Sequence, residues 1–60
     1  MATWEELGYR VEQAAGMVSE QADCTMDEAL VMLLERASVQ RQTLTEIADA
    51  VLKGQIRFGL

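Results

Sequence analysis

The spacing of apolar residues predicts three amphipathic helices along this chain. The first runs from Trp4 to about Ala22, the second from Met26 to about Val39, and the third from Leu44 to about Lys53. In the second and third, apolar residues recur at steps of three and four and form one stripe. In the first, the steps alternate strictly as in a coiled-coil heptad, at Trp4, Leu7, Val11, Ala14 and Val18. The pattern predicts one all-α domain over residues 1–60.

A capping-box motif opens each predicted helix. A threonine is followed three residues later by a glutamate at Thr3–Glu6, Thr25–Glu28 and Thr43–Glu46. In such a box, each residue's side chain binds the other's backbone N–H, which satisfies two of the free donors at a helix start. Gly54 follows the third helix as a C′ glycine. Short links at 23–24 and 40–42 then fold the two shorter helices against the C-terminal half of the long first helix.

The heptad seam of the first helix has two interpretations. A domain of 60 residues buries only about 60% of its unfolded surface and is marginally stable alone. We therefore expect the seam to pair two copies into a homodimer. In the alternative, the first helix is an ordinary amphipathic helix packed inside its own bundle. Ala15 and Met17 widen the apolar face and are expected to meet the other two helices.

Gly16 lies in the middle of the first helix, where glycine costs about 1 kcal/mol relative to alanine. Such a residue permits the close approach of another backbone. That backbone belongs either to a packed helix or to a ligand, and the sequence leaves both open.

The composition argues against an enzyme. The chain has no histidine and one cysteine, Cys24, so it lacks the commonest general base, an activated thiol and a zinc ligand set. It also has no phosphate-binding glycine loop. We expect no catalytic residue, no metal and no cofactor. No apolar run approaches the roughly 20 residues that span a bilayer, and the first residues do not resemble a secretion signal. A cytoplasmic protein that binds rather than catalyses is the expectation.

The charge balance alone disfavours nucleic acid, because a net charge of −5 repels phosphates. Any such interface needs local cations. Arg36 and Arg41 lie close together in sequence near the end of the second helix. Alternatively, Arg36 pairs with Glu35 or Glu28, and Arg41 caps helix carbonyls. Arg10 is placed to pair with Glu6.

The order of several short motifs resembles the ANTAR domain family over residues 11–58. Residues 11–18 contain an Ala-x-Gly followed by an aliphatic or methionine pair, and residues 25–33 form a capped helix with a Glu-Ala pair. Residues 34–37 and 44–51 resemble the family's two closing motifs. Gly16 and Ala14 take the places of the family's glycine and alanine, and Arg36 and Arg41 take places that are often basic. Ala15 stands where many members have lysine.

The resemblance implies an RNA-binding, dimeric transcription antitermination module that recognises paired stem-loops in nascent mRNA. Such modules commonly follow a receiver or GAF sensor domain, so the sequence is either a stand-alone member or the module alone, and a sensor is an expected partner. The RNA contacts are expected at Gln13, Gly16, Met17, Arg36 and Arg41. RNA loops are read by stacking and hydrogen bonding as well as by charge.

Two other functions compete with RNA binding. One is a helical dimerisation or protein-interaction module with no RNA binding of its own. The other is a DNA-binding helix-turn-helix that reads with its third helix. Glu46 and Asp49 on that helix would face phosphates, which argues against it.

Overall fold

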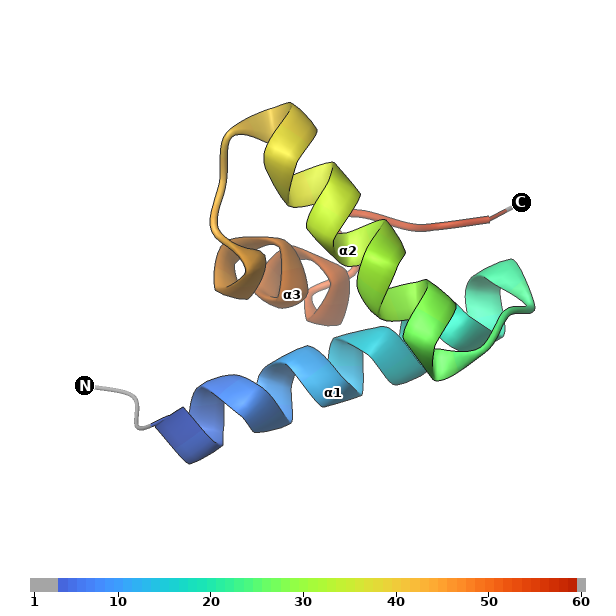
Figure 1. Ribbon diagram of the computed structural model, residues 1–60, viewed down its shortest axis with the longest axis horizontal. Helices are drawn as coiled ribbons and strands as arrows, with labels where there is room; N and C mark the ends of the chain where they lie inside the picture. The colour runs from blue at the N-terminus through green and yellow to red at the C-terminus, as the bar shows by residue number, and fades with distance from the viewer. Residues whose placement is uncertain (1–3, 60) are drawn as a thin grey trace.

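The computed structural model contains three helices, α1 (Trp4–Ala22), α2 (Met26–Gln40) and α3 (Leu44–Leu52), which pack against one another (Figure 1). The structure describes the backbone of residues 4–59 and the side chains of residues 8–59. The helices begin where the sequence predicted, and α2 and α3 end within one residue of the prediction. The predicted all-α fold is confirmed.

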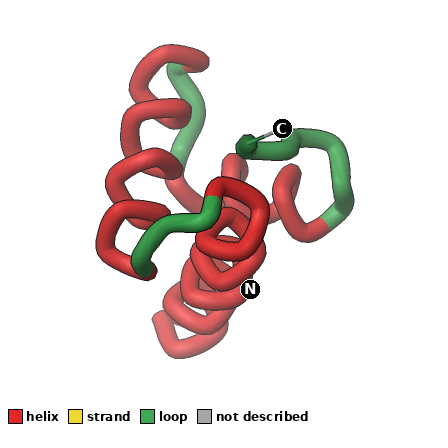
Figure 2. The backbone as a smooth tube through the Cα atoms, turned by 90° about the vertical axis from the view of Figure 1, so that its right-hand side faces the viewer, coloured by secondary structure: helices red, strands yellow, loops and turns green. Residues whose placement is uncertain are grey.

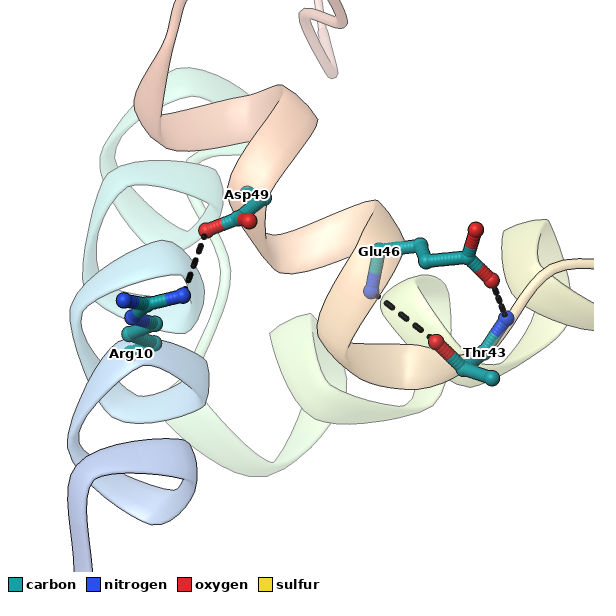
Figure 3. A network of polar contacts seen from close by, with 4 residues as sticks. All are labelled: Arg10, Thr43, Glu46 and Asp49. Atoms are coloured by element: carbon teal, nitrogen blue, oxygen red, sulfur yellow. Dashed lines mark hydrogen bonds and ion pairs between the residues drawn. The ribbon is translucent and has the colours of Figure 1, made fainter. Parts of the chain in front are cut away.

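Capping boxes open α2 and α3. The Oγ1 atoms of Thr25 and Thr43 accept from the backbone N–H of Glu28 and Glu46, each at 3.1 Å. In return, the glutamate carboxylates accept from the threonine N–H groups at 3.1 and 2.9 Å, as Figure 3 shows for Thr43. These backbone N–H bonds, and then the threonine side chains, lower the pKa of both glutamates. The third predicted box, at Thr3 and Glu6, lies outside the described residues.

All three helices end in the same way. After each helix comes a residue with left-handed backbone, and the next backbone N–H donates to a carbonyl five residues earlier. The left-handed residues are Asp23 (φ 53°), Arg41 (φ 55°) and Gly54 (φ 76°). Gly54 confirms the predicted C′ glycine. Arg41 caps α2 with its backbone N–H, which donates to Ser38 O at 3.3 Å. Its capping role therefore needs no side chain.

The core lies where the three helices meet. Every helix contributes at least one fully buried alanine, which lets the helices approach closely, and the largest fully buried side chains are Leu33, Ile47, Val18 and Val51. The buried residues are Ala14, Ala15, Val18, Ala29, Leu33, Ala37, Ile47, Ala48, Val51 and Phe58. Ala15 and the half-buried Met17 contact this core as predicted. Because Ala15 is completely enclosed by the core, a small side chain is needed at this position.

The core corrects the predicted dimer seam. Ala14 and Val18 are completely buried in the chain's own core, and the half-buried Val11 packs against it. α2 and α3 therefore cover the part of the heptad that was expected to meet a second copy. The side chains of Trp4 and Leu7, the first two seam positions, lie outside the described residues. At Ala14 and Val18, the alternative of an ordinary bundle helix applies.

The segment after α3 turns back across the helices (Figure 2). The backbone N–H of Phe58 donates to Gln21 Oε1 at 2.9 Å, and its buried ring lies 4.8 Å from the Arg36 guanidinium carbon. Gly59 has a φ of 90° and lies so close to the backbone of Gln21 that a Cβ would collide with it. The tail, which the sequence did not place, thus docks between the end of α1 and α2.

Candidate nucleic-acid interface

Three of the predicted RNA contacts share one surface. Gln13, Gly16 and Met17 line a shallow hollow together with Glu20 of α1 and Leu52 of α3; we call it the α1 hollow. The α1 members are neighbours because residues three and four apart lie on one helix face. The sequence reasoning missed Glu20, although it continues this spacing. It also missed Leu52, which the packing of α3 against α1 brings there.

Gly16 leaves the helix backbone bare inside the α1 hollow. Apart from its two chain neighbours and the backbone of its own helical turns, no described atom lies within 4 Å of the place where a Cβ would stand. Close packing of another helix of the same chain therefore does not explain the glycine. Of the two explanations that the sequence left open, approach from outside the chain remains.

An exposed amide and an exposed aromatic ring extend the α1 hollow toward the start of the helix. The Gln13 Nε2 donates to Tyr9 Oη at 3.1 Å, and Tyr9 is 61% exposed. The two residues are one turn apart on the face that carries Gly16. Aromatic rings and amides are the groups that stack on and hydrogen-bond to unpaired bases. Tyr9 was not predicted, although an exposed aromatic four residues before Gln13 was a readable signal.

The two predicted arginines lie elsewhere. Arg36 is half-buried and, with Phe58 and Val39, lines a different hollow. Its guanidinium lies over the Phe58 ring, and no ion pair with the predicted Glu35 or Glu28 forms. Arg41 is exposed in the α2–α3 link, at the end of α2 that points away from α1 in Figure 1. The five predicted contacts therefore do not form one continuous site.

Arg10 bridges α1 and α3. Its Nη1 lies 3.4 Å from Asp49 Oδ1 (Figure 3), and both side chains are partly exposed. The sequence paired Arg10 with Glu6, whose side chain lies outside the described residues. An exposed ion pair of this kind contributes about 0–1 kcal/mol. It holds one cation beside the face that carries Gln13.

The part of the chain that the structure describes shows neither a metal-binding cluster nor a membrane-spanning helix. No group of three acidic or cysteine side chains in this part of the chain is arranged to hold a metal ion. None of the helices described here combines the length and the apolar character needed to cross a bilayer.

Comparison with known proteins identifies a family. No curated protein and no solved structure matches the chain. The model of the ANTAR domain family matches residues 9–52, which hold most of α1 and all of α2 and α3. That family is generally associated with RNA-binding antitermination regulators and is not an enzyme family. Because the match covers well over half of the sequence, the chain belongs to the ANTAR domain family.

Proposed function

We propose that this chain is the RNA-binding module of a transcription antitermination regulator and that it recognises paired stem-loops in nascent mRNA as a homodimer. The bare backbone at Gly16 carries the proposal, because it has no role in the described internal packing and lies in a surface hollow. Membership of the family supports the choice of RNA as ligand. The proposed unit is all 60 residues, since the tail supplies Phe58 to the core.

The α1 hollow suits an unpaired RNA loop better than a duplex. The whole chain carries a charge of −5, so long-range attraction to phosphates is weak or absent. Binding must then come from short-range contacts. In this proposal, a loop backbone crosses α1 at Gly16 while Tyr9 and Gln13 meet its bases.

Arg41 is the proposed phosphate contact at the other end of the molecule. Its left-handed backbone costs an ordinary residue about 1–2 kcal/mol, and glycine would avoid that cost. Its side chain is exposed and makes no ion pair or side-chain hydrogen bond within the described residues. An arginine kept at a strained position, without an internal partner, points to an external one. Arg36 is a second phosphate contact in this proposal, oriented by the Phe58 ring.

The proposed dimer uses the first turns of α1. The proposed contacts are the heptad positions Trp4 and Leu7, which precede Val11, the first seam residue that the structure places against the core. Sedimentation over a range of concentrations tests this dimer, with Leu7→Glu expected to give a monomer. A sensor protein or domain that controls the module is the remaining proposed partner.

Titration of a two-stem-loop RNA at several salt concentrations tests the function. Arg41→Ala should weaken binding by roughly threefold to tenfold and reduce the salt slope by about one. Lys53→Ala is the matched control, because Lys53 is an exposed cation outside the proposed contacts. Equal effects of the two substitutions would remove Arg41 from the site. No RNA binding by the unmodified chain even at low salt would reject the function.

One observation favours the alternative of a protein-interaction module without RNA binding. Val31 and Leu34 on the outward face of α2 are 51% and 54% exposed and lie three residues apart, so they are neighbours that expose apolar surface together. A dimer that retains no RNA at moderate salt would decide for this alternative.

A further inference from the structure

A second hollow lies at the corner where α1 leads into α2; we call it the corner hollow. It measures about 470 Å³, and the uncharged part of its lining consists of Ala22, Cys24, Val31 and Met32. Three carboxylates, Asp27, Glu28 and Glu35, complete the lining. The predicted function uses none of these residues.

Apolar surface continues from the corner hollow along α2. Val31 is 51% exposed and lies inside it, and Leu34, one turn further along, is 54% exposed. No described part of the chain covers either side chain. The tail docks instead near Arg36, where Phe58 fills its own place in the core. The outward face of α2 therefore has apolar area without a partner from the described chain.

The charge at the corner hollow has one sign. The lining contains three carboxylates and no cation. The Thr25 backbone N–H lowers the pKa of Glu28, so this carboxylate stays charged in mild acid. An RNA backbone is repelled here, whereas a segment that carries cations beside an apolar side chain is attracted. The α1 hollow differs in having one carboxylate, Glu20, in its lining.

We propose that the corner hollow docks a cationic amphipathic helix of a partner protein. An apolar side chain of that helix lies against Val31 and Met32, and lysines or arginines on either side of it meet Asp27 and Glu35. This is the helix-in-groove mode of recognition with charge complementarity at the rim. The proposal does not depend on RNA binding elsewhere.

A second copy of this chain fits less well. Two of its five cations are already engaged, Arg10 with Asp49 and Arg36 with Phe58. The other three, Arg41, Lys53 and Arg57, follow helix ends rather than flanking an apolar stripe on one helix. The chain therefore does not present the cationic helix that the corner hollow would receive.

The test is an amide NMR titration of the isotope-labelled full chain. The probe is a synthetic amphipathic helix of about four turns with a leucine stripe flanked by lysines. A second peptide has glutamate in place of every lysine. Amides around Ala22, Val31 and Glu35 should shift with the lysine peptide and stay unchanged with the glutamate peptide.

Paired substitutions separate docking from general attraction to an acidic protein. Val31→Ser should lower the affinity for the lysine peptide about fivefold, and Glu35→Gln should lower it about twofold at low salt. The controls are Val39→Ser, on the same helix but 80% exposed and outside the corner hollow, and Glu12→Gln on α1. Both controls should leave peptide affinity unchanged, and melting curves should show all four variants folded, since all four side chains are exposed.

Three outcomes would overturn the proposal. In the first, the amide shifts that the lysine peptide causes in the chain spread over its whole acidic surface, or they are equally large in Val31→Ser and Val39→Ser. In the second, the same amides shift with chain concentration when no peptide is present, which would assign the corner hollow to a second copy. In the third, a stem-loop RNA shifts them and the peptide does not.

Discussion

The α1 hollow and the corner hollow differ in what they offer a ligand, although α1 contributes to both. The first presents bare backbone at Gly16, with Tyr9 and Gln13 alongside, and its lining has one carboxylate, Glu20. The second presents the half-exposed Val31 in a lining that holds three carboxylates. A net charge of −5 therefore describes neither surface well. An acidic chain can therefore carry one hollow with a single carboxylate in its lining and another with three.

The largest expected effect comes from the core that both hollows share. Leu33 is fully buried, so Leu33→Ala should lower the free energy of unfolding by about 2–5 kcal/mol, enough to unfold a domain this small. Chemical denaturation measures the loss, and RNA and peptide binding should disappear together. The control is Leu34→Ala on the same helix, which removes a side chain that is 54% exposed and should cost far less. Similar losses in the two variants would show that the core is not where the structure places it.

The next effect distinguishes two otherwise equivalent capping boxes. Thr25→Ala and Thr43→Ala should each lower the free energy of unfolding by about 1 kcal/mol at neutral pH. Only Thr25→Ala should also weaken the cationic peptide, because its box holds Glu28 at the rim of the corner hollow. If Thr43→Ala weakens the peptide as much, the rim does not bind it.

The same boxes predict a pH dependence. The Thr25 and Thr43 backbone N–H groups, and then the threonine side chains, lower the pKa of Glu28 and Glu46 in the folded chain. The unfolded chain then binds the protons more tightly, so the stabilisation is full above the ordinary glutamate pKa and is lost as the pH falls through the lowered value. The destabilisation caused by Glu28→Gln should shrink over that acid range in pH-dependent unfolding. A difference that stays constant through it would contradict the box as the source of the shift.

The smallest expected effect tests whether removing a negative charge from the α1 hollow strengthens RNA binding. Glu20→Gln removes the single carboxylate from the lining of the α1 hollow and should strengthen RNA binding about twofold at low salt. Asp27→Asn removes the same charge from the corner hollow and should change RNA binding less, because Asp27 lines neither the α1 hollow nor the hollow of Arg36. The difference should fade as salt is raised. Equal effects would mean that RNA senses only the total charge of the chain.

The parts of the fold that could be predicted are those that depend on residues close in sequence. Thr25 and Glu28 bind each other within one helical turn, and Gly54 takes the left-handed backbone that follows α3. The limits of these helices could therefore be predicted from the sequence. The heptad at Ala14 and Val18 identified an apolar face but not what would cover it. Their burial under α2 and α3 depends on how the helices fold back.

The candidate site was predictable only in part, for a similar reason. Helical spacing placed Gln13, Gly16 and Met17 together, and it could also have added Tyr9 and Glu20. Spacing says nothing about contacts between distant segments. Asp49 is 39 residues from Arg10, and Phe58 comes from a tail to which the sequence assigned no site. The predicted pairs of Arg36 with nearby glutamates failed because an aromatic ring from that tail lies against it instead.

The most direct test of the central claim compares two glycines in one helix. Apart from chain neighbours and the backbone of the same helical turns, a Cβ at Gly16 or at Gly8 meets no described atom within 4 Å, so alanine at either position should raise the free energy of unfolding, by up to about 1 kcal/mol. Gly8→Ala should leave the affinity for a two-stem-loop RNA unchanged. Gly16→Ala should weaken it roughly tenfold, because the added methyl group blocks close approach of the RNA backbone. A Gly16→Ala chain that is more stable and binds RNA as tightly as the unmodified chain would contradict the account.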